Sequence, residues 1–396
     1  MTIHRIAPTS RTLGETMTLA AVIPTKHSRN PNDVLAPGVI RAMRDDGTVD
    51  PAHDPGITDA ELVSLYTDMV RVRVLDDRLV SLQRQGRIGF HIGSIGEEAS
   101  ILGSTFAMRK NDWIFPCYRE FGAALIRGFP LQRYLDNMFG NANDTAKGRQ
   151  MPDHYTAREV HFGSISSPVG TQITHAVGFA WAAKLRHEDV VTIVYFGDGA
   201  TSSNDFHNGM NFAGVFKTPT IFFCRNNGWA ISVPTERQTA SASFAEKGTA
   251  YGVPSLRCDG NDLLAVIHAT RAALARAVRG DGPTLVEAIT YRLSGHSTSD
   301  DPKAYRQEDE VEEWRRRDPI ARLRRMLQAR GLWSDADQSK AEAEVLEQIK
   351  NAIAAAEQVP PPALPTMFED VYADMPWNLR EQSEYLLRSP RPASKR

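Results

Sequence analysis

Apolar residues recur at helical spacing from residue 62 onward and predict a long amphipathic helix with one buried face. The apolar positions of this helix are Leu62, Leu65, Met69, Val72 and Leu79. Thr58 and Glu61 stand three residues apart just before the run, which is the pattern of a capping box at a helix start. Gly86 and Gly89 predict that the helix ends before them.

Two continuous apolar runs in the middle of the chain predict buried parallel strands. Residues 190–196 read VVTIVYF and residues 220–224 read TIFFC, without the alternation expected of a half-exposed strand. A helical pattern over residues 203–216 separates them, so that strand, helix and strand form one βαβ unit. A further strand is predicted over residues 283–291. These elements together predict an α/β fold with a doubly wound, mostly parallel sheet.

The remaining helical patterns are shorter or more charged. They cover residues 96–108, 174–185, 311–330 and 334–357, with a short helix after Tyr118 that ends near Gly128. Residues 163–172 are rich in Ser, Gly and Pro and predict a loop.

Three parts of the chain differ in their patterning. Residues 1–56 are rich in Pro, Asp and Gly with weak periodicity, and we expect an extended N-terminal arm there. The α/β domain is expected over residues 57–330. Residues 331–396 are expected to form a helical C-terminal region and tail, without structure after Pro390.

The composition excludes several classes of protein. A chain of 396 residues with 41% hydrophobic content can bury a substantial core. The net charge of −2 lacks the basic footprint of a nucleic-acid binder, and the longest apolar runs are too short to span a bilayer. The three cysteines lie far apart without a CxxC pair, which argues against a disulfide framework or a zinc site and favours a reducing compartment.

The N-terminal segment leaves two locations open. Residues 1–30 contain four Lys or Arg residues, only one acidic residue and many Ser and Thr, which mildly resembles an organellar transit peptide. We expect a cytoplasmic protein whose arm is flexible or wraps a partner. The mitochondrial matrix is the alternative if residues 1–30 are a transit peptide.

Two glycine-containing turns follow the two predicted strands. Residues 197–200 read GDGA and residues 226–229 read NNGW. In a doubly wound sheet, ligands bind at the carboxyl ends of the strands, where glycine lets the backbone approach and a helix N-terminus favours phosphate. Asp198 offers a carboxylate oxygen and Asn227 an amide oxygen, which are ligands that Mg²⁺ accepts beside substrate phosphates. The pair therefore predicts a Mg²⁺ and phosphate site.

Each turn taken alone has a simpler interpretation. Gly-Asp-Gly and Asn-Asn-Gly are both common turn formers, and only their placement after two strands of one βαβ unit favours a site. A nicotinamide-binding fold would need G-x-G-x-x-G after a strand, and no such motif stands there.

The spacing of GDG and NN, about thirty residues apart, resembles the thiamine-diphosphate motif. The stretches GRQMPDHY, SISSPVGTQ, YFGDGATSSNDFHNGMNFAGVF, FFCRNNGWAIS, RCDGNDLLAV and YRLSGHSTSDDPKAYR resemble the E1 alpha subunits of branched-chain 2-oxo acid dehydrogenases. The resemblance runs from about residue 56 to about residue 385, including MFEDVYADMP. Pyruvate-type alpha subunits typically read GRGGSMH and HGHSMSDP, so the expectation of a branched substrate depends on GRQMP and STSDD.

The resemblance implies a set of site residues. The Mg²⁺ ligands it implies are Asp198, Asn227 and the carbonyl of Trp229, where the family often has Glu and Tyr at the first and last positions. The cofactor contacts it implies are Tyr118, Arg119, Ser167, Gly199, Ala200, Arg225 and His296. An arginine suits a diphosphate because its planar fork donates two bonds.

Two further groups of residues follow from the resemblance. A potassium-binding loop that orders the cofactor pocket matches Ser166, Pro168, Thr171 and Gln172, although Val169 and Gly170 replace the Leu-Ala often found in the family. His296 and His154 match catalytic positions, whereas His91 fits a structural role as readily as a functional one. Each of these histidines and loop residues could, from its own spacing alone, belong to an ordinary polar loop.

The reaction implied is the oxidative decarboxylation of branched-chain 2-oxo acids with thiamine diphosphate and Mg²⁺, followed by acyl transfer to the lipoyl group of a separate E2 protein. Such enzymes need a carboxylate beside the pyrimidine ring of the cofactor, in a second sheet domain that this sequence lacks. We therefore expect a beta subunit and an α₂β₂ heterotetramer. The alternatives are a pyruvate or acetoin dehydrogenase alpha subunit and a non-catalytic, cofactor-binding regulatory homologue. Retention of Asp198, Asn227, Arg119 and His296 argues against the last of these.

Overall fold

A six-stranded, wholly parallel sheet lies at the centre of the protein, in the order β1-β7-β8-β4-β3-β2. The structure is a computed structural model that describes residues 31–44 and 46–390. The strands of this sheet are β1 (Val39–Ile40), β2 (Trp113–Phe115), β3 (Thr192–Gly197), β4 (Thr220–Asn226), β7 (Ser255–Asp259) and β8 (Thr284–Ile289). The predicted α/β fold with a parallel sheet is confirmed.

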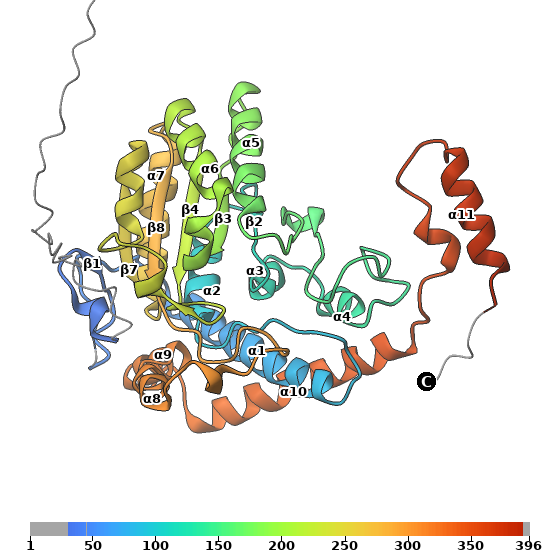
Figure 1. Cartoon of the computed structure of the whole chain (residues 1–396). Helices are drawn as coiled ribbons and strands as arrows, with labels where there is room; N and C mark the ends of the chain where they lie inside the picture. The colour runs from blue at the N-terminus through green and yellow to red at the C-terminus, as the bar shows by residue number, and fades with distance from the viewer. Residues whose placement is uncertain (1–30, 45, 391–396) are drawn as a thin grey trace, which may run out of the picture.

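Helices cover both faces of the sheet, as Figure 1 shows. On one face lie α5 (Thr171–Leu185) and α6 (Asn204–Phe216), and on the other lie α2 (Glu98–Ala107) and α7 (Leu263–Val278). Successive residues of β3 point to opposite faces: Ile193 belongs to the core beneath α2 and α7, and Val194 to the core beneath α5 and α6. Because both faces are covered, the strand reads as a continuous apolar run.

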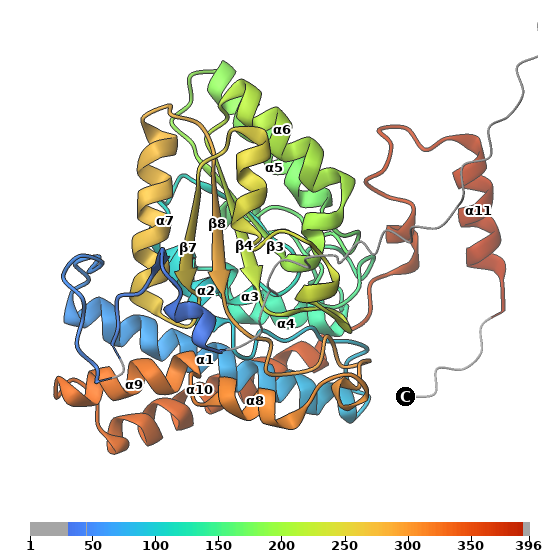
Figure 2. The same ribbon diagram turned by 60° about the vertical axis from the view of Figure 1, so that its left-hand side comes forward.

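A layer of helices lies across one end of the sheet (Figures 1 and 2). It contains α1 (Asp59–Arg84), α8 (Glu308–Arg315), α9 (Pro319–Ala329) and α10 (Asp335–Gln358). The capping box predicted at Thr58 and Glu61 is confirmed at the start of α1. The single helix predicted over residues 311–330 is wrong, because Pro319 has no N–H to donate and Asp318 caps a new helix by accepting from Ile320 N and Ala321 N.

The N-terminal segment differs from the extended arm expected over residues 1–56. Val39–Ile40 form the edge strand β1, which pairs with β7. The backbone N–H groups of Ala42 and Met43 donate to Asp262 Oδ2 at 2.8 and 2.6 Å. Sequence periodicity gave no sign of this strand because it is only two residues long. The expectations for residues 1–30 and for the tail beyond Pro390 lie outside the described residues.

The short helix expected after Tyr118 is α3 (Phe121–Ile126). Several other elements were not expected from the sequence patterns, namely α4 (Leu131–Phe139), the hairpin of β5 (Trp229–Ala230) and β6 (Val233–Pro234), and α11 (Trp377–Arg388). The loop expected over residues 163–172 ends at Gly170, where α5 begins. Short 3₁₀ helices occupy Pro31–Leu35, Arg158–Val160, Asp198–Ser202, Thr235–Arg237, Ala245–Tyr251, Pro302–Ala304 and Leu364–Met367.

The C-terminal arm, residues 359–390, stands apart from the body in both views (Figures 1 and 2). Its helix α11 has no buried residue, and Trp377 and Tyr385 are 76% and 75% exposed. An ion pair between Lys147 and Asp370 ties the arm to the body. In the part of the chain that is described, no helix has both the length and the apolar character needed to cross a membrane.

Candidate active site

A cavity of about 350 Å³ lies at the carboxyl edge of the sheet, where β3 and β4 end. It is lined by residues that end or follow β3 and β4, within 197–200 and 225–231, and by residues from loops elsewhere in the chain. Its lining includes all seven residues that the resemblance assigns to the cofactor, namely Tyr118, Arg119, Ser167, Gly199, Ala200, Arg225 and His296. The three predicted metal ligands, Asp198, Asn227 and Trp229, line it as well. The structure thus brings these residues together, and their roles stay predictions.

The two glycine-containing turns meet through a chain of hydrogen bonds. Asn227 N donates to Asp198 Oδ1 at 3.3 Å, and Trp229 N donates to Asn227 Oδ1 at 3.2 Å. The carbonyl of Trp229 accepts from Arg292 Nη1 at 3.3 Å, and Gln238 Nε2 donates to Asp198 Oδ2 at 2.5 Å. One carboxylate, one amide oxygen and one carbonyl oxygen therefore belong to residues that line the same cavity, and together they form a donor set that suits Mg²⁺.

The surroundings of Asp198 also fit a cation. Its side chain is buried, and burial raises the pKa of Asp198 to about 6, although hydrogen bonds from Gln238 and Asn227 oppose the rise. A divalent ion beside this carboxylate would hold it ionised. Among the described residues no three His, Cys, Asp or Glu side chains converge as a metal site, so the predicted site depends on amide and carbonyl oxygens.

A close backbone approach shapes the floor of the cavity. A Cβ atom added at Gly199 would come within 2.6 Å of Ala230 Cβ, so no larger residue fits there without movement. Gly170 has a φ of +95°, and a Cβ added there would come within 2.3 Å of Ser203 Oγ. Both positions therefore require glycine for reasons of space, and the close approach of the turn to a ligand stays a prediction.

The two arginines predicted to bind phosphate are already engaged by the protein. The terminal nitrogens of Arg225 form ion pairs with Glu97 and Glu120, which leaves its Nε as the donor without a partner among the described residues. Burial alone would lower the pKa of Arg225, but Glu120 and Glu97 raise it above its usual range. The two terminal nitrogens of Arg225, which could donate to a diphosphate, therefore pair with carboxylates in this structure.

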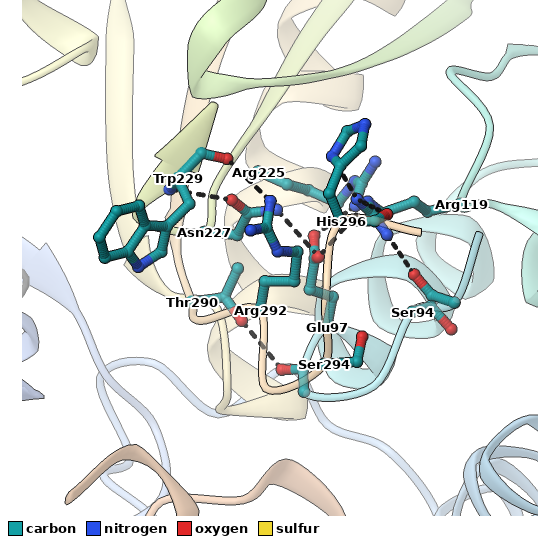
Figure 3. A network of polar contacts seen from close by, with 12 residues as sticks. Ser94, Glu97, Arg119, Arg225, Asn227, Trp229, Thr290, Arg292, Ser294 and His296 are labelled. Carbon is teal, nitrogen blue, oxygen red and sulfur yellow. Dashed lines mark hydrogen bonds and ion pairs between the residues drawn. The ribbon is translucent and has the colours of Figure 1, made fainter. Parts of the chain in front are cut away.

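Arg119 holds the loop that carries His296 (Figure 3). Its Nη2 donates to the His296 carbonyl at 2.8 Å and lies 3.2 Å from His296 Nδ1, and its Nη1 donates to the Gly93 carbonyl. Burial, Arg119 and Arg292 together lower the pKa of His296 to about 3. Because arginine only donates, the neutral imidazole accepts at Nδ1 and carries its proton on Nε2.

His154 reaches the cavity through a second residue. It is 3% exposed, its Nδ1 lies 3.0 Å from the Pro152 carbonyl, and its Nε2 is hydrogen-bonded to Ser167 Oγ. A carbonyl only accepts, so Nδ1 carries the proton and Nε2 accepts from the Ser167 hydroxyl. His154 therefore fixes Ser167 in the wall of the cavity and does not line the cavity itself.

The loop predicted to bind potassium has one oxygen that fits a cation. Gln172 is buried, and its Nε2 donates to the Tyr195 carbonyl at 2.9 Å. Its Oε1 is buried and has no hydrogen-bond partner in the described chain. Ser166, Pro168 and Thr171 lie in the turn directly before and at the start of α5, where Thr171 N donates to the Pro168 carbonyl at 3.4 Å.

Sequence reasoning missed the residues that lie behind the predicted ligands. Glu97 and Glu120 are fully buried beside Arg225, and Arg292 binds the Trp229 carbonyl. Glu97 and Glu120 follow no buried strand and form no motif with the turns, so spacing alone could not join them to the site. The remaining cavity wall is apolar and includes Phe90, Ile92, Met151, Val169 and Ile231.

His91 belongs to a second buried cluster beside the site. Its Nε2 lies 2.9 Å from Asp76 Oδ1 and its Nδ1 lies 3.1 Å from Asp153 Oδ2. Burial alone would lower the pKa of His91, but Asp153 and Asp76 raise it to about 10. Tyr134 donates to Asp153 Oδ1 at 2.7 Å, which completes the cluster. The structure places His91 behind the cavity wall, which agrees with a structural role.

Comparison with known proteins agrees with this geometry. Residues 66–364 match the family model described as "Dehydrogenase E1 component". The chain is 44% identical over 360 residues to "2-oxoisovalerate dehydrogenase subunit alpha, mitochondrial" of Bos taurus, covering 90% of this chain and 79% of that protein. The Homo sapiens protein of the same name is 43% identical, with 90% and 81% covered. "2-oxoisovalerate dehydrogenase subunit alpha 2, mitochondrial" of Arabidopsis thaliana is 44% identical, with 84% and 70% covered.

Proposed function

This chain belongs to the dehydrogenase E1 component family, and from that premise we propose that it is the alpha subunit of a branched-chain 2-oxo acid dehydrogenase. The family depends on thiamine diphosphate. The observation that carries the proposal is the cavity where Asp198, Asn227 and the Trp229 carbonyl lie opposite Arg119 and His296. The retained site argues against a non-catalytic homologue.

In this proposal the chain holds the diphosphate end of the cofactor. Asp198, Asn227 and the Trp229 carbonyl would bind Mg²⁺, and the ion would in turn bind the diphosphate. Gly199 and Ala200 let the backbone approach the phosphates at the start of a 3₁₀ helix, while Tyr118, Ser167 and the Nε of Arg225 complete the wall. Gln172 Oε1, with Ser166, Pro168 and Thr171, would hold a potassium ion behind this wall.

Thiamine diphosphate, when bound, supplies the electron sink for the carbon–carbon bond cleavage that releases CO₂. The chain itself orients and protects the reacting groups. His296 stays neutral near pH 7 and presents an Nε2–H donor, because Arg119 occupies its Nδ1. That donor suits a diphosphate oxygen or a substrate oxygen that gains negative charge. The side chains of Ile92, Met151 and Val169 add apolar surface to the same space.

The substrate class follows from the relatives and from the cavity. The matched relatives are named for 2-oxoisovalerate, a branched-chain 2-oxo acid, and they match this chain along 84–90% of its length. Met151, from the GRQMP stretch, and the neighbouring apolar residues line the cavity, which suits a branched aliphatic acyl chain. We prefer this substrate class to pyruvate or acetoin for both reasons.

The chain needs a partner to complete the proposed reaction. Residues 31–44 and 46–390 contain one parallel sheet, and the activating carboxylate expected beside the cofactor pyrimidine would come from a beta subunit in an α₂β₂ heterotetramer. The exposed Trp377 and Tyr385 of the C-terminal arm, with Met151 and Ile231 near the cavity, offer apolar surface for such a partner. An E2 protein would then accept the acyl group on its lipoyl group.

The location of the protein is a separate question. The relatives are named as mitochondrial, so they give no support to the cytoplasmic location expected from the sequence. Residues 1–30, where a transit peptide would lie, are outside the described chain. We therefore propose the mitochondrial matrix as the location if residues 1–30 direct import, and a test is the location of a fusion with and without them.

The proposal is tested with the purified full chain, alone and with its beta subunit. Thiamine diphosphate and Mg²⁺ are added, and decarboxylation is measured with an artificial electron acceptor. We expect no turnover by the chain alone, turnover by the pair, and a higher kcat/KM for 2-oxoisovalerate than for pyruvate. Asp198→Ala should abolish Mg²⁺-dependent cofactor binding in calorimetry while the circular dichroism spectrum is unchanged.

Three results would contradict the proposal at different points. Turnover without a second polypeptide would refute the divided site. A preference for pyruvate would refute the substrate class. Unchanged cofactor affinity in Asp198→Ala would refute the metal assignment.

A further inference from the structure

Glu97 lies at the centre of the polar network beneath the cavity, as Figure 3 shows. It is fully buried at the N-cap position of α2, where its side chain caps no backbone N–H. Its Oε2 accepts from Arg225 Nη1, and its Oε1 accepts from Asn227 Nδ2 at 2.9 Å. The Nε of Arg119 lies 3.9 Å from the same Oε1. One carboxylate thus contacts three residues of the proposed cofactor site.

The contact with Asn227 fixes which way its amide points. An ionised carboxylate only accepts hydrogen bonds, so Asn227 must turn its NH₂ group toward Glu97. Its Oδ1 then faces the other side, where it accepts from Trp229 N, while the backbone N of Asn227 donates to Asp198 Oδ1. Without Glu97 only the hydrogen bond from Trp229 N would hold the amide in this orientation, and its NH₂ group would lose its acceptor.

A second buried carboxylate offers an internal comparison. Glu120 is as buried as Glu97 and pairs with the other terminal nitrogen of Arg225. Among the described contacts Glu120 has none with Asn227. Both carboxylates balance the charge of Arg225, but only Glu97 also holds an amide that lies at the proposed metal site.

We infer that Glu97 is a positioning residue for the cation site, which it serves by holding the oxygen of Asn227 toward Asp198 and the Trp229 carbonyl. This inference rests on the proposed function and extends it to a residue behind the ligands. Residues that orient metal ligands typically contribute about 10- to 100-fold to metal affinity. Glu97 should therefore set the affinity for Mg²⁺ more than the affinity for the cofactor itself.

The test compares Glu97→Gln with Glu120→Gln in the full chain reconstituted with its beta subunit. Calorimetric titration of thiamine diphosphate over a range of Mg²⁺ concentrations gives the apparent Mg²⁺ constant. We expect Glu97→Gln to weaken Mg²⁺ about 10- to 100-fold, because glutamine can offer either oxygen or NH₂ to Asn227. Glu120→Gln should change it less than about threefold, and thiamine diphosphate affinity at saturating Mg²⁺ should stay near the wild-type value in both variants.

A merely structural role predicts a different pattern. Both variants would then lower the thermal midpoint of the metal-free complex and weaken Mg²⁺ equally, and that result would overturn the inference. An unchanged Mg²⁺ constant in Glu97→Gln would overturn it as well. If Glu97→Gln does not assemble, Glu97→Asp keeps the charge beside Arg225 but withdraws the oxygen from Asn227. If Glu97→Asp binds Mg²⁺ as tightly as the wild type, the inference about Glu97 is overturned as well.

Failure of the proposed function has its own signature. If the wild-type complex shows no Mg²⁺-dependent binding of thiamine diphosphate at all, the proposed function is refuted and this inference with it. If the wild type binds and the two glutamine variants behave alike, only the role of Glu97 is refuted.

Discussion

Arg225 and His91 are both buried cations held between two carboxylates, but only one of them lines the cavity. Arg225 lies between Glu97 and Glu120, and its Nε is left without a partner among the described residues. His91 lies between Asp76 and Asp153, and both of its ring nitrogens are occupied. Arg225 is 2% exposed and His91 is 0% exposed, so burial does not distinguish them.

Arg225 and His91 differ in how many N–H groups remain after each has paired with its two carboxylates. A guanidinium has five N–H groups, so two carboxylates do not exhaust it, whereas an imidazolium has two. Arg225 can therefore balance charge in the core and keep one N–H group, at Nε, that no described residue accepts. His91 can only hold its neighbours together. A buried ion pair is thus weak support for a functional site unless a donor or acceptor remains free on the cavity side.

The largest expected effect comes from Arg225→Met. It leaves two buried carboxylates without their cation, and breaking such a pair typically costs about 3–5 kcal/mol of stability. It also removes a charged donor from the cavity, a loss of about 1.5–3 kcal/mol that corresponds to about 10- to 100-fold in thiamine diphosphate affinity. Urea unfolding and calorimetry measure the two effects separately.

Arg257→Met is the matched control for this prediction. Arg257 also pairs with a buried carboxylate, Glu287, but does not line the cavity. We expect it to leave cofactor affinity within about twofold. Equal cofactor affinity in Arg225→Met and the wild type would show that Arg225 is as structural as His91.

The second prediction uses the fact that only His91 can lose its charge. The pKa of His91 is raised to about 10 in the folded protein, whereas a free histidine has a pKa of about 6.5. Its stabilising contribution is therefore complete below about pH 6.5 and is lost as the pH rises toward 10. The stability difference between the wild type and His91→Phe, about 3–5 kcal/mol at neutral pH, should therefore narrow between pH 7 and pH 10. Urea unfolding across this range measures it.

Arg225→Met sharpens the comparison in the same experiment. The pKa of Arg225 is raised above its usual range, so this arginine stays charged between pH 7 and pH 10. The stability difference between Arg225→Met and the wild type should therefore stay constant over that range. A constant difference for His91→Phe would mean that His91 is not held as an imidazolium. We also expect His91→Phe to reduce cofactor affinity by less than about tenfold, because its ring nitrogens face away from the ligand.

The smallest expected effect concerns two glycines of one turn. Gly199→Ala brings a Cβ within 2.6 Å of Ala230 Cβ, and overpacking of this kind typically costs about 1–3 kcal/mol. We expect thiamine diphosphate affinity to fall about tenfold, measured by calorimetry. Gly197→Ala is the control, since its Cβ would meet nothing closer than 4.0 Å. Equal affinities for the two variants would show that the approach to Ala230 does not shape the site.

The sequence predicted the parts of the site that lie directly after buried strands. Asp198 and Asn227 were found because β3 and β4 read as continuous apolar runs, and parallel strands bring their carboxyl ends to one edge. The arrangement of the sheet itself was only partly predictable. Strands β1 and β2 are two and three residues long, which is too short to produce a period.

The second layer of the site could not be predicted for a different reason. Glu97 and Glu120 contact Arg225 across sequence separations of more than one hundred residues, and neither stands at a strand end. A buried carboxylate in a sequence looks like any exposed one until the fold is known. The diphosphate contact expected of Arg225 stays a prediction, and the sequence did not reveal the two carboxylates that pair with its terminal nitrogens.

The edge strand β1 can pair only after β7, which the ribosome makes much later, has been synthesised. Ala42 N donates to Asp262 Oδ2 across 220 positions of the chain, and β1 pairs with β7. At about 5–20 residues per second, a ribosome takes on the order of ten to forty seconds to make that stretch. Residues 39–43 therefore leave the ribosome well before the strand and the carboxylate that they contact have been made. A product that stops before β7 leaves these residues without either partner, so the backbone N–H groups of Ala42 and Met43 have no acceptor there.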